Sequence, residues 1–134
     1  MHRLKISLLS LYTLLIAYVT LSSDSSSDSV VPDLNTFGIS NLDKLAHTGA
    51  YALFYILAVT GFGMKRLKSI RAILLIYGMI LEILQTWVPQ REPSLEDFLA
   101  NLLGVILGSL VMFVLDKLPK NRFTLALLPN SDKS

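Results

Sequence analysis

The stretch LEDFLANLLGVILGSLVMFVL, residues 95–115, decides the fold class of this 134-residue chain. After Asp97 it carries no charged residue, and it has about the length of ~20 residues that an α-helix needs to cross ~30 Å of hydrocarbon. Backbone N–H and C=O groups in lipid must be satisfied within their own segment, which a helix achieves. We therefore expect this stretch to be a transmembrane helix.

Three further stretches have similar length and apolar character, roughly residues 4–21, 42–63 and 72–88. The chain is 52% hydrophobic and 16% charged, with a mean hydropathy of +0.55, which is too apolar for a soluble globule of this size. No stretch alternates polar and apolar residues with the period of two that indicates strands. The sequence predicts an all-α fold, a four-transmembrane-helix bundle.

The charged residues predict the orientation of these helices. Most basic residues fall before the first span, between the second and third, and after the fourth: Arg3, Lys5, Lys65, Arg66, Lys68, Arg71, Lys117, Lys120, Arg122 and Lys133. The other two loops contain Asp24, Asp28, Asp33, Glu92 and Glu96. The positive-inside rule then gives cytoplasmic N- and C-termini in a multi-pass protein of the plasma (inner) membrane.

Four segments follow from this topology: residues 1–22, the first helix; 23–41, a serine-rich outer loop; 42–116, a core of three transmembrane helices; and 117–134, a cytoplasmic tail. A basic start, an apolar run and then small residues also describe a secretory signal peptide. The absence of an A-x-A-like site and an apolar run longer than an h-region of 7–15 residues favour a retained signal anchor.

Polar residues within the predicted spans gather near the outer, non-cytoplasmic face. A charged side chain at the bilayer centre costs about 2.5–3.5 kcal/mol on insertion scales, so each one needs an explanation. Helical spacing places the polar residues of each span on one stripe, and lipid cannot solvate such stripes. We expect one polar site with these lining residues: Asp43, Lys44, His47, Tyr51, Glu82, Gln85, Arg91, Asp97 and Asn101.

Some of these residues also have structural interpretations. Asn41 is suited to cap the second helix, with Asp43 complementing the helix dipole in the first turn. Ser94 and Asp97 fit a capping box at the start of the fourth helix.

Lys44 and Arg91 are long enough to reach lipid headgroups with their charged ends. Gly104 and Gly108 suit close helix packing better than chemistry. Glu82 and His47 are harder to explain structurally, because neither is expected to cap a helix at its position and both lie at hydrocarbon depth. These two are the candidate catalytic residues, if the site is catalytic.

The polar pattern resembles the VanZ-like membrane proteins, named after a protein associated with low-level teicoplanin resistance. The resemblance covers about residues 33–108 and rests on the pattern Asp43-Lys44-x-x-His47-x-x-x-Tyr51, Glu82-x-x-Gln85, Pro89-x-Arg91 and Ser94-x-x-Asp97-x-x-x-Asn101-x-x-Gly104-x-x-x-Gly108. Many members have an acidic residue before the glutamate and a histidine before the glutamine, where this chain has Leu81 and Leu84. The resemblance implies a membrane protein linked to the cell envelope and to glycopeptide resistance.

Two classes of function fit these residues. A binding protein would hold a membrane lipid headgroup, a lipid-linked cell-wall precursor or a glycopeptide, with Arg91, Lys44 and His47 pairing to phosphate or carboxylate. An enzyme would act on a lipid-linked phosphate or ester, with His47 as general base or nucleophile, and Glu82 or Asp43 orienting it. The residues do not decide between them, although we favour binding.

Other functions fit less well. A third class, a metal site built from His47 and the carboxylates, ranks lowest, because one histidine and no cysteine make a thin ligand set for zinc. The carboxylates with the Gln85 and Asn101 oxygens would suit a harder ion better. We expect no metal and no cofactor. The chain lacks a G-x-S-x-G elbow, an H-E-x-x-H motif, a P-loop and a Rossmann glycine pattern. Its basic residues form short clusters beside the predicted spans, which argues against nucleic acid as a partner.

Overall fold

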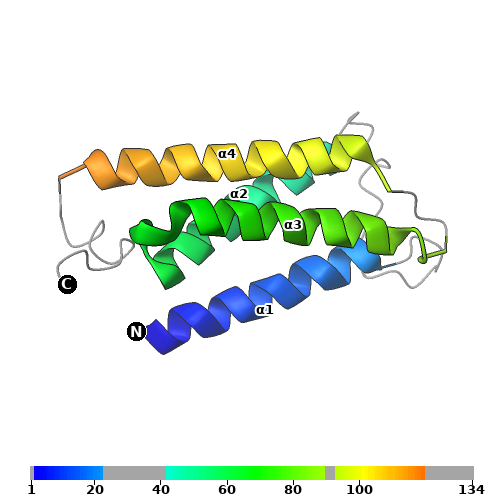
Figure 1. Cartoon of the computed structure of the whole chain (residues 1–134), viewed down its shortest axis with the longest axis horizontal. Helices are drawn as coiled ribbons and strands as arrows, with labels where there is room; N and C mark the ends of the chain where they lie inside the picture. The colour runs from blue at the N-terminus through cyan, green and yellow to red at the C-terminus, as the bar shows by residue number, and fades with distance from the viewer. Residues whose placement is uncertain (1, 23–41, 90–92, 120–134) are drawn as a thin grey trace.

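The structure, a computed structural model, describes residues 2–22, 42–89 and 93–119, which form helices and no β-strand. The elements in chain order are α1 (His2–Leu21), α2 (Leu42–Phe62), the short 3-10 helix η2 (Met64–Arg66), α3 (Leu67–Gln85) and α4 (Leu95–Lys117). The four α-helices lie lengthwise along one another, with α3 drawn between α1 and α4 and in front of α2 (Figure 1). The start of α1 and the end of α4 lie at the same end of the bundle (Figure 1). The prediction of an all-α fold is confirmed.

Helix α3 differs most from the stretch expected at residues 72–88. It begins at Leu67, so Lys68 and Arg71 belong to the helix and not to the loop before it. Lysine and arginine are good helix formers whose long side chains reach polar surroundings, so these charges do not prevent helix formation. The helix ends at Gln85 and tightens into a turn, in which the N–H groups of residues 86–88 donate to carbonyls three residues earlier. Pro89 then disfavours helical backbone at Val88, the residue before it.

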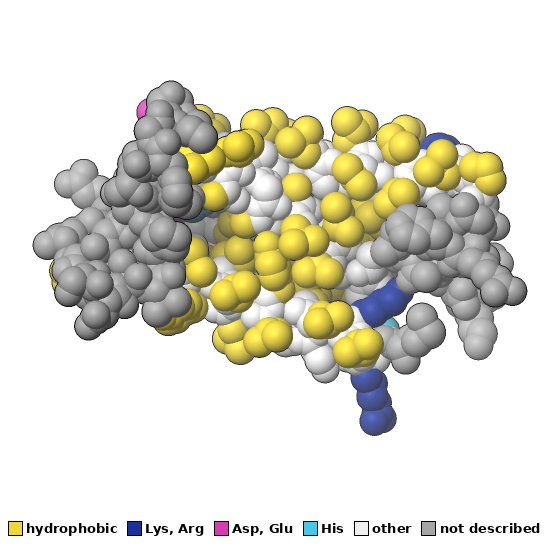
Figure 2. Space-filling view, turned by 180° about the vertical axis from the view of Figure 1, so that it is seen from behind, with side chains coloured by type: hydrophobic (Ala, Val, Ile, Leu, Met, Phe, Trp, Pro, Cys, Tyr) yellow, Lys and Arg dark blue, Asp and Glu magenta, His cyan; other side chains and the backbone are white. Residues whose placement is uncertain are grey.

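Three helices, α1, α2 and α4, are long and apolar enough to cross a membrane by length and composition. Helix α3 has three charged residues, Lys68, Arg71 and Glu82. Exposed apolar side chains cover the flanks of the bundle between its two ends (Figure 2). A soluble protein rarely exposes so much contiguous apolar surface, whereas lipid solvates it.

The closest packing in the bundle is between α2 and α4. At Gly104, a Cβ atom would collide with the backbone oxygen of Thr48, and at Gly108 it would lie 2.6 Å from the oxygen of Ala52. Glycine therefore lets the two backbones touch, as small residues do in membrane helix pairs. The fully buried side chains beside this contact include Tyr55, Val59, Val105 and Met112.

Helix α1 is attached to its neighbours through hydrogen bonds to backbone carbonyls. The Tyr12 hydroxyl donates to Ala50 O at 3.0 Å, and the Tyr77 hydroxyl donates to Thr13 O at 2.7 Å. The Phe54 ring makes edge-on contacts with both tyrosine rings, at centroid distances of 5.6 Å and 5.7 Å. These contacts integrate α1 into the bundle.

The glycine contact gives a first prediction. Gly108→Ala should destabilise the bundle by about 1–3 kcal/mol, the usual cost of overpacking, because the new methyl group meets the rigid backbone of α2. Reversible unfolding in mixed micelles, followed by circular dichroism, measures the change. The control is Gly49→Ala, where a Cβ has nothing within 4 Å. Equal stability of the two variants would contradict the role given to Gly108.

Candidate functional site

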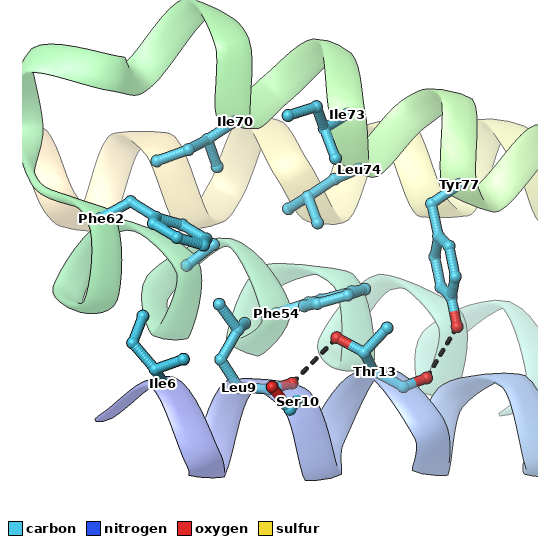
Figure 3. Close-up of a pocket in the computed structure, with 11 residues that line it drawn as sticks. Ile6, Leu9, Ser10, Thr13, Phe54, Phe62, Ile70, Ile73, Leu74 and Tyr77 are labelled. Atoms are coloured by element: carbon cyan, nitrogen blue, oxygen red, sulfur yellow. Dashed lines mark hydrogen bonds between the residues drawn. The ribbon is translucent and has the colours of Figure 1, made fainter. Parts of the chain in front are cut away.

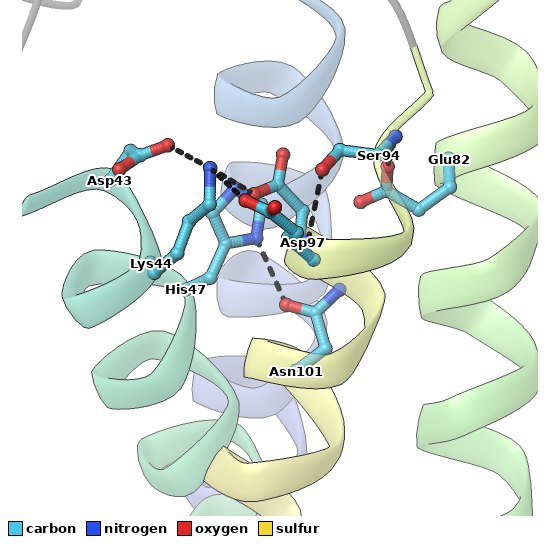
Figure 4. Close-up of polar contacts among 8 residues, drawn as sticks. Asp43, Lys44, His47, Glu82, Ser94, Asp97 and Asn101 are labelled. Atoms are coloured by element: carbon cyan, nitrogen blue, oxygen red, sulfur yellow. Dashed lines mark hydrogen bonds and ion pairs between the residues drawn. The ribbon is translucent and has the colours of Figure 1, made fainter. Parts of the chain in front are cut away.

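An ion-pair group lies at the end of the bundle where α2 and α4 begin. Lys44 Nζ lies 2.6 Å from Asp43 Oδ2, 3.3 Å from Asp97 Oδ1 and 3.5 Å from Glu96 Oε2 (Figure 4). The Lys44 side chain is 28% exposed and that of Asp97 is 15% exposed, so the pair between the two helices is mostly removed from solvent. Three carboxylates thus share one ammonium group, and the group is acidic as a whole.

His47 continues the contact between α2 and α4 one turn further along. Its Nδ1 lies 2.9 Å from Asn101 Oδ1, and Asn101 is 2% exposed. With the amide oxygen toward the ring, Nδ1 donates this hydrogen bond and Nε2 is the nitrogen that can act as acceptor or base. Asn101 therefore orients the ring of His47.

Glu82 contacts the start of α4 and does not contact His47 directly. Its Oε2 accepts a hydrogen bond from the Ser94 N–H at 3.2 Å, and Glu82 is 6% exposed. Ser94 is the N-cap of α4, and its Oγ accepts from the Asp97 N–H at 3.2 Å. In a complete capping box, the side chain of the third helical residue would take the Ser94 N–H. Here Glu82 takes it, while the Asp97 carboxylate turns to Lys44.

This geometry corrects the expectation that Glu82 has no capping role. Glu82 belongs to α3 but caps α4, so the sequence of α3 alone does not show this role. A buried carboxylate that accepts a backbone N–H at a helix start also lies at the positive end of the helix dipole. Part of the reason for an acid at this depth is therefore structural.

One predicted site residue points elsewhere, and another lies beneath the polar group. Gln85 donates through Nε2 to Thr20 O of α1 at 2.9 Å and is 2% exposed, so it joins α3 to α1. Tyr51 is buried, and a Cβ at Gly78 would lie 2.9 Å from its hydroxyl and 3.3 Å from Asn101 Nδ2, so the ring reaches both α3 and the Asn101 side chain.

The structure thus joins six of the nine predicted residues through a chain of contacts: Asp43, Lys44, His47, Glu82, Asp97 and Asn101. Arg91, and the proposed cap Asn41, lie outside the described residues. Sequence reasoning missed Glu96 as a participant, whereas it predicted Ser94 as the cap of the fourth helix, a role that the structure confirms. Glu96 was assigned to the outer loop. The clues to its role were its position next to Asp97 and the presence of a cation, Lys44, on the facing helix.

Among residues 2–22, 42–89 and 93–119, no group of three or more His, Asp or Glu side chains is arranged to hold a metal ion. The carboxylates that are close together instead surround Lys44.

The apolar helices and the polar group at one end of the bundle define a helical membrane protein. Residues 6–116 match the family described as VanZ/LLP1, and the chain therefore belongs to the VanZ/LLP1 family. The match is wider than the resemblance over residues 33–108 and includes nearly all of α1. No curated protein and no solved structure matches the chain.

The ion-pair group gives a second prediction. Lys44→Met should lower the free energy of unfolding by about 1–3 kcal/mol, because it leaves facing carboxylates without their cation. Lys44→Arg should restore most of the stability, since the charge remains. Thermal unfolding in detergent measures the difference, with Lys68→Met in the first turn of α3 as the control. A Lys44→Met variant as stable as the control would show that the ion pairs contribute nothing.

Proposed function

We propose that this VanZ-like protein crosses the plasma membrane four times and binds an amphiphilic ligand at its outer end. The ligand is a lipid headgroup, a lipid-linked cell-wall precursor or a glycopeptide, and its binding links the protein to the cell envelope and to glycopeptide resistance. The observation that carries the proposal is the joining of polar side chains from α2, α3 and α4 at one end of an otherwise apolar bundle. Lipid would not solvate these groups, so a polar surface or ligand must.

The distribution of charge supports four crossings with both termini in the cytoplasm. Arg3 and Lys5 at the start of α1, Lys65 and Arg66 in η2, and Lys117 at the end of α4 lie at the end opposite the polar group (Figure 1). The dark blue side chains visible in Figure 2 lie at one end of the molecule and the magenta at the other. Helix α3 lies alongside the three apolar helices, which supports it as the fourth span.

Retention of the first helix is supported by two observations. The family match begins at residue 6, inside α1. Three side chains join α1 to the other helices by hydrogen bonds to or from its residues: Tyr12, Tyr77 and Gln85. If α1 were cleaved as a signal peptide, the Tyr77 and Gln85 side chains would lose their acceptors, and the carbonyl contacted by Tyr12 would lose its donor.

The charge of the described site favours a ligand with an amine. Lys44 is already paired with carboxylates, so it is poorly placed to neutralise a phosphate. The carboxylates of Asp43, Glu96 and Asp97 outnumber it and would attract a cationic group. An anionic part of the same ligand would then pair with Arg91, which remains a prediction from the sequence.

The second candidate is an enzyme that acts on a lipid-linked phosphate or ester. The oriented His47 ring favours it, because Nε2 would be available as a base. The contacts of the carboxylates are against it: Glu82 caps α4 and Asp43 pairs with Lys44, so neither orients His47 in the way the enzyme hypothesis requires. Binding therefore remains the better-supported proposal.

Topology is tested with single cysteines, since the chain contains none. Ser26→Cys and Glu92→Cys should react with an impermeant thiol reagent in intact cells, and Lys65→Cys should react only after lysis. Reaction of Lys65→Cys in intact cells would reverse the orientation. Reaction of Lys65→Cys and Glu92→Cys on the same side of the membrane would exclude α3 as a span, because these two positions flank it.

The choice between binding and catalysis is tested with His47→Gln and Glu82→Gln. Both keep a hydrogen-bonding side chain, and Gln at 82 still offers an acceptor to the Ser94 N–H, so folding should be preserved. We expect a graded loss of glycopeptide protection in cells with matched amounts of protein, and unchanged lipid-linked precursors by mass spectrometry. The matched control is His2→Gln at the opposite end.

An enzyme would give a different result. General acid–base groups contribute about 10²–10⁴-fold, so one substitution would abolish nearly all turnover. A modified lipid that disappears in His47→Gln cells would contradict the binding proposal. Wild-type protection by every variant would mean that the polar group is structural only.

A further inference from the structure

A second feature, an apolar pocket of about 250 Å³, lies between α1, α2 and α3 (Figure 3). Its walls come from residues at helical spacing on each helix, among them Ile6, Leu9, Phe54, Ala58, Ile70 and Leu74. In the bundle it lies toward the end where α1 and α3 begin. It is therefore separate from the polar group around Lys44.

Two of the three hydroxyl groups in the pocket wall, those of Thr13 and Tyr77, are already hydrogen bonded. Thr13 Oγ1 donates to Leu9 O at 2.9 Å, and the Tyr77 hydroxyl donates to Thr13 O at 2.7 Å (Figure 3). A wall this apolar offers too few polar partners to hold an ordered water. An empty one would cost the packing energy of its lining. Hydrocarbon is the occupant that this chemistry accepts.

Two arginines lie beside the pocket at its basic end. Arg3 precedes the wall residue Ile6 by three positions on α1, which places it one turn beyond the pocket on the same helix face. Arg66 is the last residue of η2 and the N-cap of α3, four positions before the wall residue Ile70. Both are exposed. Guanidinium groups at this position suit a phosphate at the membrane surface.

We propose that the pocket binds one acyl chain of an anionic phospholipid, with the lipid phosphate at Arg3 and Arg66. The apolar walls take the chain, and the arginines select the headgroup by charge. This lipid site is distinct from the outer site under Proposed function. In the proposed orientation, this lipid lies in the inner leaflet. That placement rests on the proposed function, whereas the chemistry of the pocket is the same in either orientation.

The chain-binding part is tested with Ser10→Phe. Ser10 lines the pocket and is exposed, so a phenyl ring there fills the space without burying a polar group. The full-length protein is reconstituted in phosphatidylcholine vesicles with or without phosphatidylglycerol, and retained lipids are measured by native mass spectrometry. Retained phosphatidylglycerol should fall below the wild-type amount, because the ring takes the place of the chain and the chain loses its packing contacts with the pocket wall. Ser7→Phe, an exposed serine of α1 outside the pocket lining, is the control.

The headgroup part is tested with the double variant Arg3→Gln and Arg66→Gln. It should retain phosphatidylcholine and phosphatidylglycerol equally, whereas the wild type should prefer phosphatidylglycerol. The control Lys117→Gln, at the same end on α4, should keep the preference.

Three results would overturn the proposal. Equal lipid retention by Ser10→Phe, Ser7→Phe and the wild type would exclude the pocket as the chain site. A wild type without preference for phosphatidylglycerol would exclude the anionic headgroup. A protein dimer that disappears in Ser10→Phe would identify a second copy of the chain as the occupant. Circular dichroism of each variant shows whether a loss of lipid reflects a loss of fold.

Discussion

The contact between the backbones of α2 and α4 is the constraint on which the polar end depends. Gly104 and Gly108 bring α4 against the carbonyl groups of Thr48 and Ala52. At this separation, short side chains reach across, as in the hydrogen bond from Thr48 Oγ1 to Ala100 O at 3.2 Å. The pairs of Lys44 with Asp97 and of His47 with Asn101 continue the same register toward the helix starts. Larger residues at the two glycines would separate all of these pairs together.

The rest of the bundle uses a different kind of interaction. Helices in lipid gain little from burying apolar surface, because lipid tails are as apolar as leucine. Helix α1 is accordingly attached through hydroxyl and amide donors that reach main-chain carbonyls, and through edge-on aromatic contacts around Phe54. These directional contacts hold α1 in place while a pocket remains between it and α3. The two ends of the molecule can then differ in chemistry, one polar and acidic, the other apolar with a basic rim.

Glu82 shows how a buried acid stabilises a helix other than its own. As acceptor for the Ser94 N–H, it stabilises the start of α4 and fixes where that helix enters the bundle. Asp97 is then left to pair with Lys44. The acidic character of this end of the bundle follows from this exchange of partners, since a capping box completed by Asp97 would have removed that carboxylate from the ion pair. The buried acid in α3 is therefore explained by the cap that it provides to α4.

The sequence by itself determined the all-α fold, the approximate bounds of the helices and the grouping of polar residues at one end. Those properties depend on local terms: helix rise, the thickness of hydrocarbon and the spacing of polar residues along each helix. The sequence did not determine which side chains contact one another. That Glu82 caps α4, that Gln85 turns to α1 and that a pocket lies between three helices were decided by the tertiary structure. Such contacts depend on the rotation of each helix about its axis and on its distance from its neighbours. The spacing of residues within one helix determines neither quantity.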